Sequence, residues 1–344
     1  MRWMRSVVVA GVIALLLAGG VAAEPVRLLF IDTQAGAPYD DARQATVNEL
    51  RRLLSAGGRR LEVQHYSLQH YDGIATRIWH SLGEAERHHD AVVVNGTMAA
   101  QAFRALAKDQ PQQRFFFLAV TDPVGLGLID SFDHPPSANF TGVSYPVPVR
   151  ERLRLLRAVM PKARTIGLIY ADMPQSHSYR HWLEAALAEP EFRDLKVIYR
   201  QIPFVPSDGG QQRMARLAAA EAQQLDGLVD LFLAPNDQLG VQPYFAQALA
   251  TVISKPLMGV GERDVREGWG AAFTIYADQA EAGRQLAEML FRYVSGTPFA
   301  EIRPQPPRKF GVLYDPVLSQ RFGLKQLQLP LVPVKDAAAT AVDE

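Results

Sequence analysis

Short polar stretches stand where apolar, strand-like runs stop, and their side chains suit hydrogen bonding to a ligand. They are Asp32-Thr33-Gln34, Asn95-Gly96-Thr97, Thr121-Asp122, Tyr170-Ala171-Asp172 and Asn236-Asp237. Open α/β sheets bind ligands outside the carboxyl ends of their strands, and free N–H groups at helix starts favour anions such as carboxylates. The convergence of all five therefore predicts a binding site. At any single position the alternative stays open that Asp, Asn and Thr only cap helices and form turns.

Motifs for catalysis are weak or missing. Gly259-Val260-Gly261 begins like a dinucleotide loop, but Asp264 stands where the third glycine belongs, and neither GxxxxGK[ST] nor HExxH occurs. The stretch Gly142–Pro146 lacks the second glycine of a nucleophile elbow. His177 and His181 have a metal-ligand spacing, yet no carboxylate follows at a matching offset, which favours solvated histidines. The sequence predicts no catalytic residue, no metal and no cofactor, hence a protein that is not an enzyme.

Aromatic side chains at loop or crossing positions are a further indication of a ligand cleft. These side chains are Tyr39, Tyr170, Trp269 and Tyr276. Flat rings in a cleft often enclose a planar or apolar ligand group, and ordinary packing between two lobes explains the same positions equally well.

Composition bounds the class of protein. The chain has 344 residues, 48% of them hydrophobic, so about two domains with real cores are expected. Its 36 basic residues balance 36 acidic ones, without the basic surplus of a nucleic-acid-binding protein. The absence of cysteine excludes disulfides, thiolate zinc sites, a catalytic cysteine and a lipid attached to an N-terminal cysteine.

The first residues have the pattern of an export signal. Arg2 and Arg5 precede an apolar run from Val7 to Ala18, and small residues at Val21 and Ala23 are placed for cleavage before Glu24. We expect cleavage after Ala23 and a periplasmic location. The alternative is an uncleaved anchor, although a spanning helix needs about 20 apolar residues and this run is shorter.

Beyond Glu24, short apolar runs alternate with amphipathic stretches. The pattern predicts strands such as Val26–Ile31, Leu61–Tyr66, Ala91–Val94, Arg114–Val120 and Thr165–Tyr170, and helices such as Asp41–Leu54, Val149–Met160, Tyr179–Ala188, Gln238–Thr251 and Asp278–Ser295. This spacing is typical of βαβ units, hence of parallel sheets. Two such series, with crossing segments at Asn139–Ser144, Ala271–Tyr276 and Phe310–Tyr314, predict an α/β protein of two Rossmann-like lobes with a cleft between them.

Several stretches resemble one family. Val120–Ile129 reads VTDPVGLGLI and Asn139–Ser144 reads NFTGVS, and together they resemble the ABC-transporter substrate-binding proteins related to the tryptophan-binding TrpX type. Asn95-Gly96-Thr97, the helix at Ala282–Ala287 and Phe322-Gly323-Leu324 keep that family's order. The resemblance spans roughly Ala91 to Pro330.

The resemblance implies a type I periplasmic-binding fold, with three crossover strands and a small ligand held at the hinge. The implied division is a signal peptide at 1–23, an N-terminal lobe at 24–143 plus 276–308, a C-terminal lobe at 144–275 plus 309–330, and a tail at 331–344. The implied ligand-facing residues are Thr33, Gln34, Asn95, Gly96, Thr97, Thr121, Asp122, Tyr170, Ser176, Asn236 and Asp237. Gly57–Tyr66 and the charged loop Gly261–Asp264 depart from the family pattern, so the resemblance leaves the ligand open.

The leading hypothesis is an exported, monomeric solute-binding protein. It would capture an amino acid or another small polar or aromatic solute and deliver it to an ABC permease in the inner membrane, without contact to nucleic acid. One alternative is a periplasmic sensor that acts on a membrane kinase or cyclase. A second alternative, from another class, is a secreted α/β enzyme.

Overall fold

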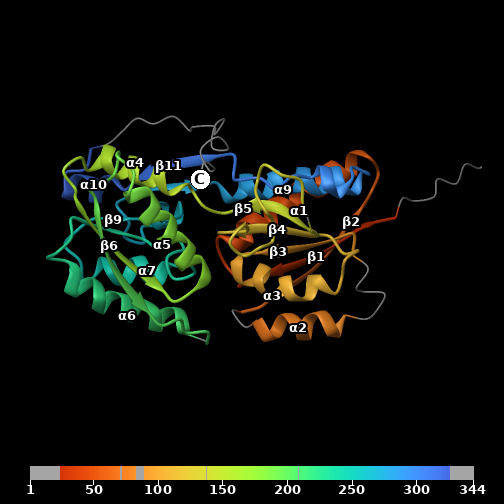
Figure 1. The fold of residues 1–344 in the computed structure, drawn as a ribbon, viewed down its shortest axis with the longest axis horizontal. Helices are drawn as coiled ribbons and strands as arrows, with labels where there is room; N and C mark the ends of the chain where they lie inside the picture. Colours follow the sequence, from red (N-terminus) through yellow and green to blue (C-terminus); the bar gives the residue numbers. More distant parts are fainter. Residues whose placement is uncertain (1–23, 70–71, 83–88, 137, 208, 326–344) are drawn as a thin grey trace, which may run out of the picture.

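The computed structural model describes residues 24–69, 72–82, 89–136, 138–207 and 209–325, arranged as two α/β lobes side by side (Figure 1). The predicted signal peptide and tail lie outside these residues. The strands are β1 Val26–Asp32, β2 Leu61–Ser67, β3 Ala91–Asn95, β4 Phe115–Val120, β5 Phe140–Ser144, β6 Thr165–Ala171, β7 Lys196–Ile202, β8 Leu231–Leu233, β9 Leu257–Met258, β10 Phe273–Ala277 and β11 Phe310–Tyr314. The helices are α1 Tyr39–Ala56, α2 Asp72–Ser81, α3 Thr97–Lys108, α4 Val149–Val159, α5 Pro174–Leu187, α6 Gly210–Leu225, α7 Pro243–Ala250, α8 Arg263–Arg266, α9 Gln279–Val294, the 3-10 turn η1 Phe299–Glu301 and α10 Pro316–Phe322.

The N-terminal lobe is built on a parallel sheet with strand order β2-β1-β3-β4-β5. Its central strands are mostly apolar, and β4 is apolar throughout, as expected where helices cover both faces of a sheet. Alternate side chains of β4 point to opposite sides: Phe115 and Phe117 pack with α2 and α3, whereas Phe116 and Leu118 pack with α1 and α9. Every β4 residue is therefore buried, as a two-sided core requires.

Helix α9 belongs spatially to the N-terminal lobe although it follows strands of the other lobe. It lies beside α1 and contacts β4 and β5 (Figure 1). Gly283 permits this close packing, because a Cβ there would come within 2.9 Å of the Ala45 side chain. Asp278 begins the helix by accepting a hydrogen bond from the Glu281 N–H, 2.9 Å away.

The C-terminal lobe has a six-stranded sheet with the order β11-β10-β9-β8-β6-β7. Helices α4, α5 and α10 pack on one face, and α6 and α7 on the other. Strand β11 runs antiparallel to β10, so the sheet is mixed, and the prediction of parallel sheets is refined at this edge. The direction follows from the connection: the chain leaves β10 for α9 in the other lobe and returns from there.

The chain crosses between the lobes three times, after β5, after β10 and before β11. The carboxyl ends of β1, β3 and β4 lie on the same side as the crossings, facing those of β6, β8 and β9. The expected two-lobed type I architecture is confirmed. The limits predicted for the two lobes stay a prediction.

Two predicted helix boundaries are wrong by about a turn. Helix α5 begins at Pro174 instead of Tyr179, and α7 begins at Pro243 instead of Gln238. Each helix has proline in its first turn, where the missing N–H costs nothing. Ser176 therefore lies inside the first turn of α5, and Asp237 lies in a loop before α7.

Candidate functional site

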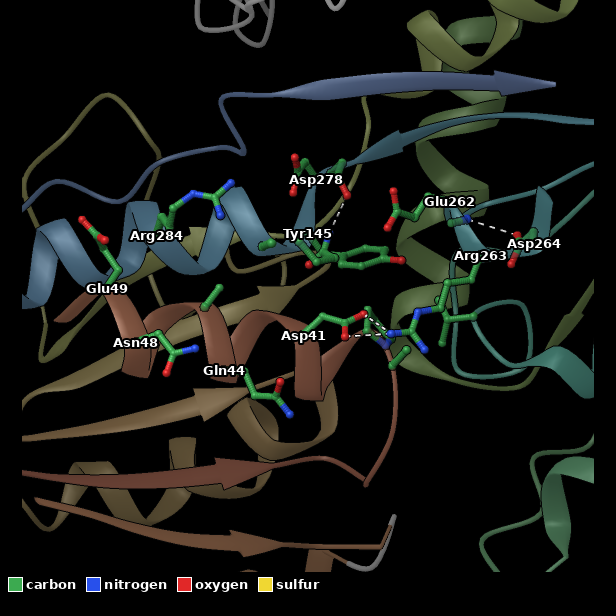
Figure 2. Close-up of a pocket in the computed structure, with 18 of the residues that line it drawn as sticks. Asp41, Gln44, Asn48, Glu49, Tyr145, Glu262, Arg263, Asp264, Asp278 and Arg284 are labelled. Atoms are coloured by element: carbon green, nitrogen blue, oxygen red, sulfur yellow. Dashed lines mark hydrogen bonds and ion pairs between the residues drawn. The ribbon is translucent and has the colours of Figure 1, made fainter. Parts of the chain in front are cut away.

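Cavities lie between the two lobes at the carboxyl ends of the strands. An outer cavity of about 650 Å³ is lined by α1, by the loop after β9 and by the start of α9 (Figure 2). A first inner cavity of about 20 Å³ and a second of about 10 Å³ lie deeper. Tyr145, which follows β5 directly, lines all three cavities.

On the N-terminal side, Asp32 organises the ends of the strands. Its buried carboxylate accepts hydrogen bonds from Asn95 at 2.8 Å and His65 at 2.9 Å and pairs with Arg43. Asn95 also donates to the Tyr39 carbonyl oxygen at 3.0 Å. Burial and the Arg43 charge lower the pKa of His65, which favours the neutral ring. Asp32 and Asn95 thus hold the wall of the site in place.

Helix α3 starts at this wall. The Thr33 hydroxyl oxygen accepts a hydrogen bond from the Ala99 N–H at 3.1 Å, and the Thr97 hydroxyl oxygen accepts one from the Thr121 N–H at 3.1 Å. Gly96 has a φ of +99°, and a Cβ there would lie 2.6 Å from the Tyr39 ring. Glycine is therefore required where Tyr39 packs on the loop.

The first inner cavity receives three of these residues, Tyr39, Thr97 and Thr121. Burial raises the pKa of the Tyr39 phenol, so its hydroxyl is neutral and can donate a hydrogen bond. Gln34 lies at the same edge, where its Oε1 accepts a hydrogen bond from Gln211 of the other lobe at 2.8 Å.

Asp122 and Tyr170, two of the predicted site residues, lie away from the three cavities. Five other predicted residues do not line the cavities either, although they lie next to residues that do: Thr33, Gln34, Asn95, Gly96 and Ser176. Asp122 accepts a hydrogen bond from the Gly125 N–H at 2.8 Å and so forms the turn after β4. The Tyr170 hydroxyl is bonded to Arg180 at 2.9 Å and to Gln201 at 3.2 Å, on the outer side of β6. Neither residue lines the three cavities. Successive side chains of a strand point to opposite faces of the sheet. Tyr170 is the next-to-last residue of β6, and its side chain points away from the cleft.

On the C-terminal side, the Asp237 carboxylate holds the surrounding loops together. Its carboxylate accepts four hydrogen bonds, from the Ser176 hydroxyl at 2.8 Å and from the N–H groups of Ala171 at 3.1 Å, Leu239 at 2.9 Å and Gly240 at 2.9 Å. Burial raises the pKa of Asp237 while these donors oppose the rise. Asp237 lines the first inner cavity, but both of its carboxylate oxygens already accept hydrogen bonds from the protein.

Other buried amides around the inner cavities lack partners among the described residues. The atoms are Nε2 of Gln34, Oε1 of Gln175, Nδ2 of Asn236, and both Nε2 and Oε1 of Gln238. Gln175, Asn236 and Gln238 all line the first inner cavity. A buried polar group without a partner costs about 1–3 kcal/mol, so such a cluster marks a place where another molecule's polar groups fit.

Sequence reasoning missed Tyr145, Arg152, Gln175 and Gln238 as residues of this site. Arg152 had a visible signal, because it lies between Val149 and Leu156 on the apolar face of a predicted helix, where a charge is unexpected. Gln175 and Gln238 had no such signal: each is only the sequence neighbour of a predicted residue, Ser176 and Asp237 respectively.

The outer cavity is lined by charges that pair with one another. Arg263 binds both carboxylate oxygens of Asp41 at 2.7 Å, joining the two lobes (Figure 2). Arg52 pairs with Glu49 at 2.6 Å. Asp264, buried at 1% exposure, is different: it accepts hydrogen bonds from the Val260 N–H at 2.6 Å and the Gly261 N–H at 3.1 Å. Burial raises the pKa of Asp264 to about 6.

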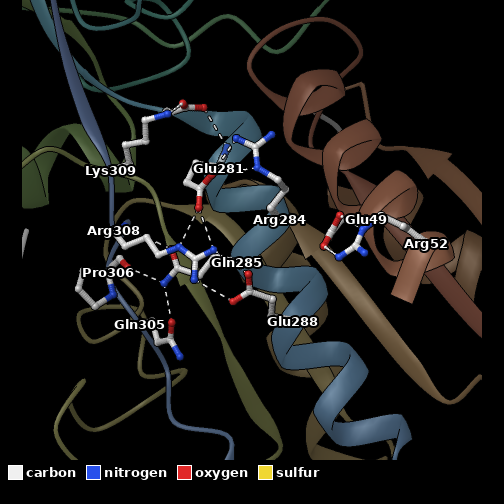
Figure 3. A network of polar contacts seen from close by, with 11 residues as sticks. Glu49, Arg52, Glu281, Arg284, Gln285, Glu288, Gln305, Pro306, Arg308 and Lys309 are labelled. Atoms are coloured by element: carbon white, nitrogen blue, oxygen red, sulfur yellow. Dashed lines mark hydrogen bonds and ion pairs between the residues drawn. The ribbon is translucent and has the colours of Figure 1, made fainter. Parts of the chain in front are cut away.

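A polar network fastens the third crossing to α9, next to the outer cavity (Figure 3). Arg308 bonds to both oxygens of Glu288 at 2.8 Å and to Glu281 at 2.8 Å. Gln285 donates to Gln305 at 2.6 Å and to the Pro306 carbonyl at 3.0 Å. The crossing segment before β11 is thus held to the N-terminal lobe.

Within the described part of the chain, no group of three or more His, Asp or Glu side chains is arranged to hold a metal ion. None of the helices in these same residues combines the length and the apolar character needed to span a membrane. The donors and acceptors around the inner cavities instead suit a small polar organic ligand.

Comparisons with known proteins show which family of ligand-binding proteins this chain resembles. A family model described as ABC transporter substrate binding protein matches residues 41–323. A tyrosine-binding protein of Clostridioides difficile is 37% identical over 81 residues, a match that covers 24% of this chain and only 22% of that protein.

Solved structures share the fold. An ABC domain from Streptococcus pneumoniae in complex with L-Trp has a TM-score of 0.71 at 19% identity, covering 88% of this chain and 95% of that one. A conserved domain protein from Vibrio cholerae has a TM-score of 0.72 at 20% identity, covering 88% and 96%. The family's members are substrate-binding proteins and not enzymes, which confirms the prediction that the chain is not an enzyme.

Proposed function

The chain belongs to the family of ABC transporter substrate-binding proteins, and from this premise we propose that it captures an amino acid, an aromatic one in particular, and delivers it to an ABC importer. The observation that carries the proposal is the set of buried, unpartnered amides of Gln175, Asn236 and Gln238 around one interlobe cavity. Two similar proteins, a tyrosine-binding protein and a domain solved in complex with L-Trp, support the ligand class.

Two tyrosines support an aromatic ligand. Tyr39 comes from the N-terminal lobe and Tyr145 from the first crossing, and both line the first inner cavity. Aromatic rings attract other rings in stacked or edge-to-face contacts. The amides nearby supply donors and acceptors for the polar end of an amino acid.

Capture requires the lobes to separate. Each inner cavity is about the size of a water molecule, so a larger ligand enters only when the cleft widens. The polar contacts that must open include Arg263 with Asp41, Gln211 with Gln34 at 2.8 Å, and the Gln242 amide with the Ala37 carbonyl at 3.2 Å. A ligand that bonds to both lobes then favours the closed form by its greater affinity for that form.

The proposal includes location and partner. The charged and apolar pattern of residues 1–23 supports export to the periplasm with cleavage after Ala23. The family supports an ABC permease as the partner that recognises the closed lobes. Uptake of the identified ligand by cells with and without this protein tests delivery: unchanged uptake contradicts it.

The ligand class is tested by thermal unfolding of the purified protein with each of the twenty amino acids, and with sugars and nucleosides as other classes. A ligand at 100 times its dissociation constant adds about 2.7 kcal/mol to the free energy of unfolding. We expect L-tryptophan or L-tyrosine to raise the midpoint most. Tyr170→Phe, outside the cavities, should keep the response, and Asn236→Ala should reduce it. No rise with any amino acid contradicts the ligand class.

A further inference from the structure

Arg152 is a buried arginine without an ionic partner among the described residues. Only 2% of it is exposed, and within this part of the chain its guanidinium donates hydrogen bonds to carbonyl oxygens and not to a carboxylate. Its Nη2 donates to the Gly259 carbonyl at 2.8 Å and, more weakly, to the Ala234 carbonyl at 3.4 Å. The guanidinium lies over the Tyr179 ring, 5.5 Å from its centroid. Its Nε has no partner there.

Such an arrangement leaves the positive charge without a direct ion pair, although the buried Asp264 carboxyl interacts with it electrostatically. A guanidinium stays protonated in proteins, so it cannot lose its charge on burial. Carbonyl oxygens and a ring face stabilise it in part, but an isolated buried charge remains costly. The Oδ2 of Asp264 accepts hydrogen bonds from the Val260 and Gly261 N–H groups instead of one from Arg152.

The second inner cavity brings unpartnered donors together. It is lined by Arg152, whose Nε is unpartnered, by Asn236, whose Nδ2 is unpartnered, and by Tyr145. The other walls are apolar, formed by Val147, Val260, Ile275 and Ala277. Donors without acceptors, next to a positive charge and away from water, fit a molecule that supplies negatively charged oxygen atoms.

We propose that Arg152 and Asn236 bind the carboxylate of the captured ligand. The two inner cavities share Tyr145 and Asn236, so a ligand anchored by its carboxylate in the second extends into the first, toward Tyr39. This inference rests on the proposed function and deepens it, because it makes the carboxylate the group that the cleft selects. Esters, amides and amines of the same side chain are then poor ligands.

The competing explanation is structural: Arg152 would only bind the carbonyl groups at the ends of β8 and β9. The two roles differ in selectivity. If Arg152 is structural, its substitution changes the affinity for acids and amides alike. If Arg152 binds the carboxylate, its substitution weakens the binding of acids and leaves the affinity for amides unchanged.

The experiment measures dissociation constants by calorimetry for L-tryptophan, L-tyrosine and their carboxamides, with the wild-type protein and three variants. We expect the wild type to prefer each acid over its amide by about 100-fold, as two charge-assisted hydrogen bonds predict. Arg152→Lys retains the charge but loses the fork of donors, and should reduce this ratio to about tenfold or less. Asn236→Ala should reduce it less. Arg180→Lys is the matched control, because Arg180 also lies over a tyrosine ring, Tyr199, but outside the cavities.

Each other outcome contradicts the assignment in its own way. If the wild type binds acid and amide equally, the carboxylate site is wrong and the proposed ligand class stands. If no amino acid or amide binds, the proposed ligand class fails, and the carboxylate assignment with it. If Arg152→Lys weakens acid and amide alike, Arg152 is structural. If the Arg152→Lys variant does not fold, the acid-to-amide ratio of Asn236→Ala tests the assignment. This substitution should not disturb folding, because Asn236 Nδ2 bonds to none of the described residues.

Discussion

The outer and inner cavities differ in how their polar groups are satisfied. The outer cavity is about 650 Å³, and charges that line it form ion pairs: Asp41 with Arg263 of the other lobe, and Glu49 with Arg52 on the same helix. The inner cavities are about 20 and 10 Å³, and their amides lack partners among the described residues. Exposed ion pairs contribute little and water replaces them readily, whereas buried unpartnered groups cost about 1–3 kcal/mol each. Cavity size therefore favours the outer cavity as the binding site, whereas the unpartnered polar groups favour the inner cavities.

The largest effect is expected from a change that fills the inner wall. Gly96→Val forces a side chain against the Tyr39 ring at a φ of +99°, so backbone strain and overpacking together should cost about 4 kcal/mol in the free energy of unfolding. Urea unfolding measures it. Gly227→Ala is the control, because a Cβ there meets nothing within 4 Å. Equal, small effects for both would show that the inner wall is not tightly packed.

Asp264 sharpens the comparison, because it lines the outer cavity but is buried like the inner groups. Its pKa is about 6 in the folded protein against the ordinary 3.8. The folded state therefore holds a proton that the unfolded state has lost, and the stability this provides is complete below pH 3.8 and is lost as pH rises to about 6. The loss should be about 3 kcal/mol.

Comparison of the wild type with Asp264→Asn across pH 4 to 7 isolates this group, because other carboxyls with lowered pKa values, such as Glu49, act in the opposite direction in both proteins. The difference in unfolding free energy between the two should change with pH in that window. A constant difference would show that Asp264 titrates normally.

One substitution tests the cost of an unpartnered amide directly. Gln238→Met replaces a buried amide by an apolar side chain of similar shape. The amide lies beside the Tyr39 hydroxyl, but neither of its polar atoms forms a hydrogen bond of normal geometry with the described residues. The substitution should raise the free energy of unfolding by about 1 kcal/mol and weaken binding of L-tryptophan. Gln44→Met, in the exposed wall of the outer cavity, should change stability by less than about 0.5 kcal/mol. A destabilised Gln238→Met would contradict the comparison.

The smallest effect is expected from the ion pair between the lobes. Asp41 and Arg263 are 37% and 36% exposed at their side chains, so a double-mutant cycle of Asp41→Ala and Arg263→Ala should give a coupling below about 1 kcal/mol. High salt should reduce it further. A coupling well above that value and insensitive to salt would show that this ion pair is shielded from water as well as the buried groups of the inner cavities are.

Much of the fold follows from local pattern. The apolar runs at Phe115–Val120 and Ala91–Asn95 are strands buried on both faces, and the regular strand-to-helix spacing predicts two α/β lobes, as observed. Helix starts at Pro174 and Pro243 were misplaced, because proline in a first turn reads locally like a break. The short helices at Arg263–Arg266 and Pro316–Phe322 have too few turns to show a period.

The sequence by itself determined the lobes, their βα order and the loops that end at the cleft, because these depend on periodicity and on residues near in the chain. Only the tertiary structure decided which polar residues are already satisfied. Asp32 and Asp237 follow strands just as Asn236 does, yet the partners of Asp32 come from positions 43, 65 and 95, and those of Asp237 include Ser176 and Ala171. Hydrogen bonds between distant segments form only when the chain folds. The order of residues in the sequence therefore does not show which polar groups remain unpartnered and available to a ligand.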